Sequence, residues 1–377
     1  MDTHSPSQAW PQERDLLQQL ESIHDIVRAR YPTVDRVAFA LYDQDTELLK
    51  TFVSSNSDDV ALRGHEAPLS EVPSLLELAR SGGHRVDDDI PGTFRAGSLH
   101  TEWLKARGYL SSYTTPIYDG QALAGFLFYD SRQAAAFTAE VCAFLDDFSS
   151  IIAKLYLLQR QVVEGIIATV HVAVGLAGMR DIETREHLHR MAHYSKLIAR
   201  HLMSSHDLSD EFVEYVLLFA PLHDIGKVGV PDSILLKPGS LSPQEWDIMK
   251  NHVPIGMGII DQICDEMSLA DSLSSRMMRN IVGQHHERCD GSGYPRGLRG
   301  DEISLEARIV AVADMFDALS THRPYKPAWP MNKVTTELRS EAALGRLDAE
   351  CVDALLSNLD ELLDIQQRFA DPSRLSS

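Results

Sequence analysis

Imidazole and carboxylate side chains gather on apolar, helix-like segments in the second half of the sequence. These residues are His223, Asp224, His252, His285, His286 and Asp314. Asp314 lies within 308–317, where apolar neighbours make a lone carboxylate costly unless it is paired or bound to a cation. Imidazole with carboxylate suits iron, manganese or zinc, and the set contains no cysteine. Because there are more candidate ligands than one ion needs, the set predicts a cluster of two or three metals.

A further carboxylate and imidazole lie upstream. Glu183 and His187 stand four positions apart, which places them on one face of a helix, one turn from each other. The same helix offers rivals in Glu186, His189 and His193, and the spacing does not choose between them. Any one of these residues is also compatible with an exposed helix surface or a hydrogen-bonded core. The metal interpretation therefore depends on the conjunction of the histidines and carboxylates.

Longer motifs around these residues resemble those of a known family. They are ETREHLHRMAHY (183–194), HDIGKVGVPDSILLKPG (223–239), HHERCDGSGYP (285–295), DMFDAL (314–319) and THRPYK (321–326). The third motif contains Gly293-Tyr294-Pro295. Together the motifs resemble the HD-GYP family of phosphodiesterases over roughly residues 165–340.

The resemblance implies a metal-ligand set and singles out Glu183 and His187 over their rivals. The implied ligands are Glu183, His187, His223, Asp224, His252, His285, His286 and Asp314. Asp224 is expected to bridge two ions. Glu183 matches family members with three metals, so the resemblance favours a trinuclear over a dinuclear centre. It implies iron, with manganese as the alternative, and no other cofactor.

Three basic residues and one tyrosine are expected to contact the substrate. Lys227, Arg323 and Lys326 match the family's phosphate contacts, and Tyr294 with its surrounding glycines is expected to shape a loop beside the substrate. Without the motifs these charges would be read as solvated surface. The resemblance gives His223, Asp224 and Lys227 the catalytic positions.

The implied activity is hydrolysis of cyclic di-GMP to pGpG, GMP or both. Two alternatives remain open. One is an HD phosphohydrolase that acts on another nucleotide, and the other is a non-catalytic cyclic di-GMP receptor that signals to a partner. The complete ligand set argues against the receptor.

The first 138 residues predict a separate small domain. A helical pattern at 16–27 is followed by a strand-like pair within 36–53, and a second pair occupies 111–129 around the turn Asp119-Gly120. This order resembles a GAF domain, with an antiparallel sheet flanked by helices. Sensing of an unknown ligand and structural dimerisation are equally compatible with the sequence. No cysteine precedes Cys142, which makes an attached bilin unexpected.

The expected fold class is α+β. A GAF-like α/β domain (1–138) is followed by a linker helix (139–174) and an all-α HD-GYP domain (175–377). The linker has apolar residues near heptad spacing, so it is either a dimerising coiled-coil helix or a helix packed on its own domains. A homodimer through the first domain and the linker is the expected assembly. Helix breaks are expected at 226–238, 254–258, 291–300 and 324–330.

The composition narrows the class of partner. The chain has 377 residues and a formal net charge of −20, which disfavours nucleic-acid polymers as partners, because their binding depends on basic surface. The four cysteines form no C-x-x-C motif. The first residues lack the pattern of a signal peptide, and no apolar run is long enough to span a membrane, so a cytoplasmic location is expected.

Overall fold

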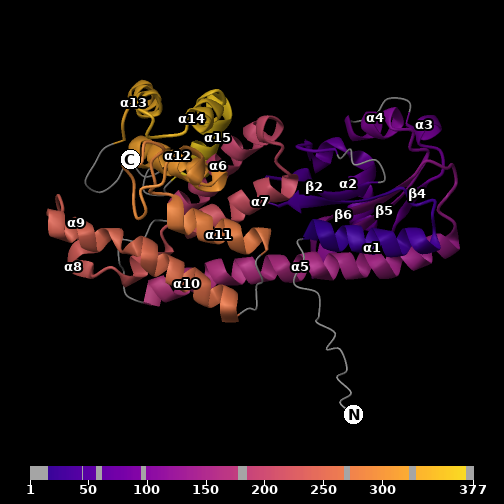
Figure 1. Ribbon diagram of the computed structural model, residues 1–377. Coiled ribbons are helices and arrows are strands. Elements are labelled where there is room, and N and C mark those ends of the chain that lie inside the picture. The colour runs from indigo at the N-terminus through magenta and orange to yellow at the C-terminus, as the bar shows by residue number, and fades with distance from the viewer. Residues whose placement is uncertain are drawn as a thin grey trace, which may run out of the picture. The chain divides into compact units, whose positions relative to one another are not determined.

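The computed structural model describes residues 16–44, 46–56, 62–94, 99–176, 185–266, 272–321 and 328–370, apart from the side chains of 159, 162–164 and 166–176. Contacts divide the chain into two compact units, Met1–Leu158 with Ser268–Leu273, and Gln159–Met267 with Ser274–Ser377. The N-terminal unit is built on a sheet, and the C-terminal unit is helical (Figure 1). The predicted α+β class is confirmed. The predicted boundaries at 138 and 174 stay a prediction.

The sheet of the N-terminal unit is antiparallel, in the order β3-β2-β1-β6-β5-β4. The strands are β1 (Arg36–Asp43), β2 (Leu48–Asn56), β3 (Glu66–Pro68), β4 (Arg85–Asp87), β5 (Ser111–Asp119) and β6 (Ala122–Ser131). The hairpins β1–β2 and β5–β6 are the two pairs that the sequence predicts, and β5 ends at the predicted turn residue Asp119. The order helix, hairpin, variable middle, hairpin, helix that was predicted for a GAF-like domain is therefore confirmed.

Both faces of the central strand β1 are buried. Val37 and Phe39 point to the face covered by α1 (Leu16–Arg30) and the first part of α5 (Ala139–Leu176), which run side by side along the sheet (Figure 1). Ala38 and Ala40 point to the opposite face, where α2 (Pro73–Ser81) packs. Because alternate residues of a strand point to opposite faces, this nearly continuous apolar strand supplies two cores. The elements α3 (Ile90–Thr93) and α4 (Leu99–Ala106) add a smaller cluster.

A cavity of about 40 Å³ lies beside the sheet of this unit. Its lining includes Arg85, Asp87 and His100 together with apolar side chains of α2 and α4. Burial, reinforced by the nearby charge of Arg36, lowers the pKa of His100 to about 3, so its imidazole is neutral. The lining therefore combines a guanidinium, a carboxylate and a neutral imidazole with apolar side chains.

The described part of the C-terminal unit contains only helices and one isolated bridge, between Asp290 and Arg299. Its helices are α6 (Arg185–His206), α7 (Asp210–Phe219), η2 (Ala220–Leu222), η3 (Ile225–Gly229), α8 (Asp232–Leu235), α9 (Pro243–Lys250), α10 (His252–Glu266), α11 (Leu273–Gln284), η4 (Gly300–Glu302), α12 (Leu305–Ser320), α13 (Met331–Ala343), α14 (Ala349–Leu356) and α15 (Leu359–Arg368). The helix α6 is central, since it packs against α7, α12, α14 and α15.

The expected helix break at 254–258 is wrong. Helix α10 runs from His252 through Pro254, Gly256 and Gly258 to Glu266. Pro254 lies in the first turn, where a backbone N–H has no partner within the helix and its loss costs little. The break at 324–330 falls mainly outside the described residues.

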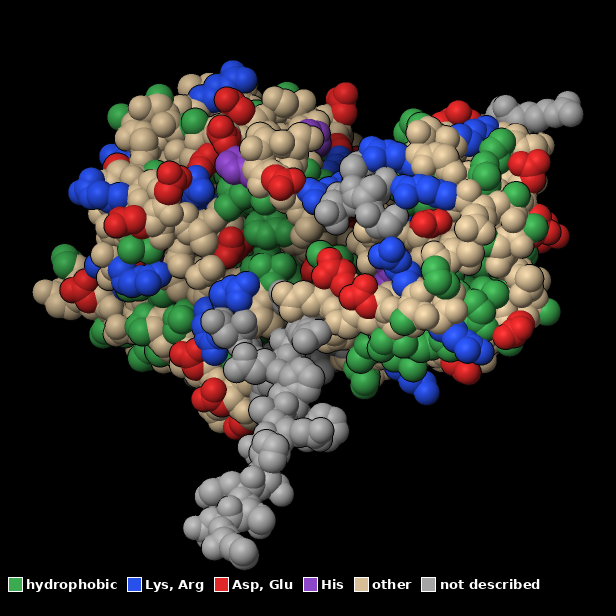
Figure 2. Space-filling model, turned by 45° about the vertical axis from the view of Figure 1, so that its right-hand side comes forward, with side chains coloured by type: hydrophobic (Ala, Val, Ile, Leu, Met, Phe, Trp, Pro, Cys, Tyr) green, Lys and Arg blue, Asp and Glu red, His purple; other side chains and the backbone are tan. Residues whose placement is uncertain are grey.

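On the face drawn in Figure 2, Lys and Arg side chains are interspersed with Asp and Glu side chains. Among the described residues, no helix has both the length and the apolar character needed to cross a bilayer.

A buried ion pair joins β1 to β6 in the N-terminal unit. Arg36 and Asp130 are 2% and 0% exposed, face each other in the strand register and form a salt bridge. Burial raises the pKa of Asp130, although the charge of Arg36 opposes this. The guanidinium of Arg36 also lies 5.0 Å from the ring centroid of Trp103 in α4. The pair therefore connects two strands and a covering helix.

Replacing Arg36 by methionine should lower the free energy of unfolding of this unit by about 3–5 kcal/mol, because Asp130 is left buried without its cation. Urea unfolding, followed by hydrogen exchange of peptides from β1 and β6, measures the loss. The double variant R36M/D130L should recover most of it. As a control, K105A removes an exposed pair with Glu102 and should change stability by less than about 0.5 kcal/mol. Equal effects of R36M and K105A would contradict the prediction.

Candidate metal centre

The pair His223-Asp224 lies at a tight turn between short helices. Helix α7 ends at Phe219, η2 covers Ala220–Leu222, and η3 begins at Ile225. The N–H of Lys227 donates to the Asp224 carbonyl at 2.9 Å, which closes the turn behind the carboxylate. His223 is fully buried and Asp224 is 8% exposed.

A glycine allows this turn to reach α10. A Cβ on Gly226 would lie 1.8 Å from the His252 carbonyl oxygen and 2.5 Å from the Gly256 nitrogen. Both atoms are backbone, so no side chain can move aside to make room. The glycine thus lets η3 approach the start of α10, which brings Asp224 next to His252.

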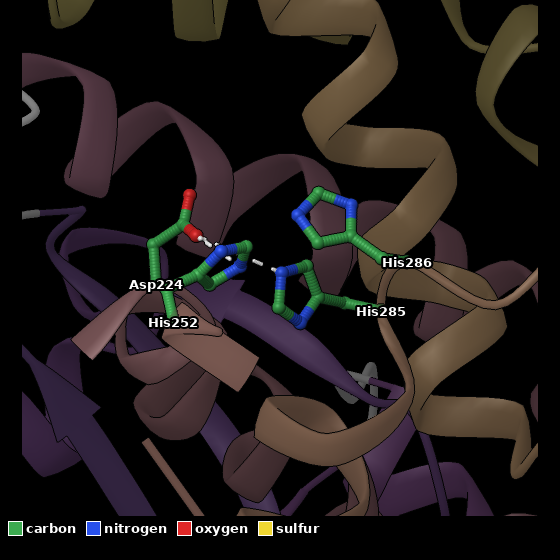
Figure 3. A group of neighbouring side chains, drawn as sticks. All are labelled: Asp224, His252, His285 and His286. Atoms are coloured by element: carbon green, nitrogen blue, oxygen red, sulfur yellow. Dashed lines mark ion pairs between the residues drawn. The ribbon is translucent and has the colours of Figure 1, made fainter. Parts of the chain in front are cut away.

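Four side chains converge at this point: Asp224, His252, His285 and His286 (Figure 3). One ligand atom from each lies within 4.8 Å of those of the others. The Oδ1 atom of Asp224 is 3.1 Å from His252 Nε2 and 3.7 Å from His285 Nε2. The group combines the η2–η3 turn, the start of α10 and the end of α11, and it could hold a metal ion.

A second group lies on the other side of the same carboxylate. His187 of α6, His223 and Asp314 of α12 bring one ligand atom each within 4.8 Å of one another. The Oδ2 atom of Asp224 lies 3.1 Å from His223 Nε2, while Oδ1 faces the first group. Asp224 therefore presents one oxygen to each group, which is the geometry that a bridging ligand needs.

Backbone carbonyls orient three of the histidines. The Nδ1 atoms of His223, His252 and His285 lie 2.8, 2.8 and 3.0 Å from the carbonyl oxygens of Ala220, Met249 and Ile281. A carbonyl only accepts, so each Nδ1 carries a proton, and a neutral ring of this tautomer presents the lone pair of Nε2 to the site. This is the protonation state in which histidine binds a metal.

Electrostatics keep the groups in these states. Burial lowers the pKa of His252, and burial together with His285 lowers that of His286. For Asp224, burial alone would raise the pKa, but Lys227 and His223 outweigh it and hold the pKa well below its ordinary range. His252 and His286 are therefore neutral imidazoles beside an ionised carboxylate.

The buried oxygen and nitrogen atoms of the first group are suited to bind a metal ion. Among the described residues, Asp224 Oδ1, His252 Nε2 and His285 Nε2 are buried without a hydrogen-bond partner. A carboxylate oxygen and an unprotonated ring nitrogen 3.1 Å apart repel each other through their lone pairs unless a cation or a proton lies between them. The arrangement therefore fits a bound divalent ion.

His187 is held by a carboxylate instead of a carbonyl. Its Nδ1 lies 2.6 Å from Asp317 Oδ2, and Arg190 donates to both oxygens of Asp317 through Nε at 2.6 Å and Nη2 at 3.1 Å. Burial alone would raise the pKa of Asp317, but the bonds from His187 and Arg190 keep it far below its usual range. Arg190 Nη1 also donates to the Phe369 carbonyl at 2.9 Å, beyond the end of α15.

Asp317 and Arg190 were not assigned roles from the sequence. A signal was present, because His187 and Arg190 are three positions apart on α6, and Asp314 and Asp317 are three apart on α12. Residues at this spacing share a helix face. A carboxylate that orients a metal-ligating histidine is a common arrangement, so the spacing could have identified both residues.

Tyr294 lies against the first group. Its ring stacks on that of His286 with centroids 4.6 Å apart, and its centroid is 6.3 Å from that of His252. Burial and the charge of Asp224 raise the pKa of its hydroxyl, which stays protonated. A Cβ on the neighbouring Gly293 would meet the Arg288 nitrogen at 2.3 Å, so this loop packs closely on its own backbone. The structure places Tyr294 beside the first group, and its contact with a substrate stays a prediction.

The remaining predicted residues divide into two classes. Lys227 is part of the site, with Nζ 2.7 Å from Asp224 Oδ2 and its side chain 29% exposed. Glu183, Arg323 and Lys326 lie outside the described residues, so their roles stay predictions.

Comparison with known proteins identifies the C-terminal part of the chain. A family model described as an HD domain matches residues 180–351. The cyclic di-GMP phosphodiesterase response regulator RpfG of Xanthomonas campestris is 45% identical over 195 residues, which cover 52% of this chain and 48% of that protein. A cyclic di-GMP phosphodiesterase of Thermotoga maritima is 39% identical over 226 residues, with 58% of each chain covered. A 3'3'-cGAMP-specific phosphodiesterase 2 of Vibrio cholerae is 38% identical over 51% of this chain and 34% of its own.

These relatives extend beyond the matched region, and this chain spans about half the length of the curated relatives it matches. Among solved structures, a phycocyanobilin-bound GAF domain from a cyanobacterial phytochrome is 20% identical with a TM-score of 0.32, over 39% of this chain and 86% of its own. At that TM-score the description of the N-terminal unit rests on its own strands and helices. In the C-terminal half, residues 180–351 form an HD domain, and the family relationship that the motifs predict is confirmed there.

Proposed function

We propose that the C-terminal unit is a metal-dependent phosphodiesterase that hydrolyses cyclic di-GMP to pGpG, GMP or both. The observation that carries the proposal is the carboxylate of Asp224, which offers one oxygen to each of two buried ligand groups. Relatives named cyclic di-GMP phosphodiesterases support the choice of substrate.

The eight predicted ligands would hold a dinuclear or trinuclear centre. The two groups around Asp224 account for two ions, and Glu183, outside the described residues, would serve a third. Nitrogen and carboxylate donors without thiolates suit iron or manganese, and we assign iron first and manganese second.

Bound ions would activate water, neutralise the phosphate and offset the charge on the leaving oxygen. The chain's own residues prepare that chemistry. Asp224 would set the spacing of the ions, and the carbonyl-bound histidines keep their lone pairs directed inward without reorganising. Lys227, beside Asp224 and partly exposed, would donate to a phosphate oxygen, as would Arg323 and Lys326. Hydrolysis adds a water oxygen to phosphorus and releases the ribose hydroxyl, giving linear pGpG and, after a second cut, GMP.

Another cyclic dinucleotide is the second candidate substrate, because several relatives are named 3'3'-cGAMP-specific phosphodiesterases. The metal groups would contact phosphate, which all cyclic dinucleotides contain, so these groups would not distinguish cyclic di-GMP from 3'3'-cGAMP. Hydrolysis rates measured with a panel of cyclic dinucleotides would distinguish the two substrates. The alternative to an enzyme is a receptor that binds cyclic di-GMP without hydrolysing it and signals to a partner.

The N-terminal unit would regulate this activity. We assign it dimerisation and a ligand of unknown identity, and α5 is the covalent route to the HD domain.

Protein purified anaerobically with iron should contain two or three metals per chain and convert cyclic di-GMP to pGpG or GMP. The variant H223A/D224A should lose both metal and turnover while its helix content is unchanged, because it removes the shared carboxylate. Elemental analysis, chromatography and circular dichroism measure the three quantities. H206A removes an exposed pair with Glu350 in the same unit and should change none of them. Bound metal with unchanged cyclic di-GMP, under both iron and manganese, would indicate the receptor or another nucleotide.

Replacing Asp317 by asparagine should weaken metal binding by about 10- to 100-fold, because His187 loses the charged acceptor that orients its ring. Competition against a chelator of known affinity measures the change. The matched control D364N removes an exposed carboxylate that pairs with Arg368 on α15, and it should leave the affinity unchanged. The same metal affinity in D317N and the wild type would show that Asp317 does not orient a ligand.

Deleting residues 1–138 should alter the specific activity or the oligomeric state, because the proposed regulatory and dimerising unit is removed. Initial rates and light scattering coupled to size-exclusion chromatography measure these properties on the full chain and the truncated chain. If both are unchanged, the first unit neither regulates nor dimerises the protein.

A further inference from the structure

An exposed tryptophan lies next to the metal centre. Trp246 of α9 is 46% exposed, although a large aromatic side chain is usually buried in a soluble protein. Its ring centroid is 6.5 Å from that of Tyr294, with the ring planes at 79°. Tyr294 in turn stacks on His286. One aromatic ring therefore separates Trp246 from a candidate metal ligand.

Helix α9 gives the backbone of Trp246 a fixed position. Ser242 and Glu245 form a capping box: Ser242 Oγ accepts from the Glu245 N–H at 3.3 Å, and Glu245 Oε2 accepts from the Ser242 N–H at 2.7 Å. Lys237 Nζ donates to the same Oε2 at 2.6 Å, which ties the preceding segment to the helix. A side chain held on a capped helix needs little ordering when a ligand arrives.

The two rings differ in what they offer a ligand. One face of Tyr294 is taken up by His286, whereas Trp246 keeps nearly half of its surface exposed. In a nucleotide, one ribose separates the phosphate from the base. When the phosphate lies at the metal groups, the ribose therefore separates the base from them. In the same way, the ring of Tyr294 separates Trp246 from the metal groups, so Trp246 lies where a base could reach it.

We propose that Trp246 is a substrate-binding residue that stacks on a nucleobase of the cyclic dinucleotide while the metal groups hold its phosphate. The proposal rests on the proposed function and extends it to the base. Stacking uses the π-face that every base has, so Trp246 contributes affinity for the nucleotide and takes no part in breaking the phosphodiester bond.

The test compares W246A and W246F with the wild type on cyclic di-GMP. W246A should raise KM about 5- to 100-fold with kcat nearly unchanged, because a stacked base contributes that much to binding. The dissociation constant of a non-hydrolysable phosphorothioate analogue of cyclic di-GMP should rise by the same factor. W246F should restore most of the affinity but lose the quenching of tryptophan fluorescence that the analogue causes in the wild type. The affinity for inorganic phosphate, which has no base, and the metal content should be unchanged in both variants.

The matched control is I248A. Ile248 lies two positions further along α9, on a different side of the helix, and is 40% exposed. It should leave KM and the dissociation constant unchanged. Wild-type affinity for the analogue in W246A would overturn the role of Trp246 and leave the phosphodiesterase standing. A parallel loss of metal or phosphate binding in W246A would show a structural role and also overturn it. A metal-loaded wild type that neither binds nor hydrolyses cyclic di-GMP would overturn both proposals.

Discussion

The carboxylate of Asp224 is the constraint around which the HD domain is arranged. It is buried, it is ionised, and each of its oxygens faces an imidazole nitrogen at 3.1 Å. An ionised carboxylate in such a place costs several kcal/mol unless positive charge compensates it. Lys227 supplies one charge from the solvent side. The Nδ1 protons of the imidazoles are directed to backbone carbonyls and away from the carboxylate. The remaining compensation is available from cations between the carboxylate and the ring nitrogens, so the fold is arranged to bind metal.

That arrangement requires elements that are distant in sequence to meet, and the packing shows how they do. Gly226 permits backbone contact between η3 and α10, which no larger residue would allow. On the other side, Asp317 connects α12 to His187 and Arg190 of α6 across 130 and 127 positions. Arg190 continues the connection to the carbonyl of Phe369, whose ring stacks on His189 and His193. These two histidines, which the sequence left as rival ligands, pack against the C-terminal segment instead.

Patterns local in the sequence predicted most of the fold and the centre. Strand-like apolar runs bounded by turn-prone residues located both hairpins, because even a strand with two buried faces needs polar turns at its ends. The motifs contain the seven described residues that were predicted as metal ligands, and the structure brings these residues into two adjoining groups. Features that depend on contacts between distant segments were not predicted, including the Asp317–Arg190 pair and the position of Trp246 near Tyr294. The break expected at Pro254 was wrong because a proline's effect depends on its place in the helix.

The location of the aromatic pair also bears on substrate choice. In the proposed activity, metal ions and Lys227 would contact phosphate, which every cyclic dinucleotide contains, so discrimination between bases would have to arise away from the centre. A stacking ring such as Trp246 accepts guanine and adenine alike, because both have a π-face. Strong discrimination instead needs hydrogen-bonding groups at the edge of the base, since a base that leaves them unpaired is rejected. A centre and a platform of this kind would accept either dinucleotide for which relatives are named, cyclic di-GMP or 3'3'-cGAMP, and the distinction would be left to side chains that reach the edge of the base.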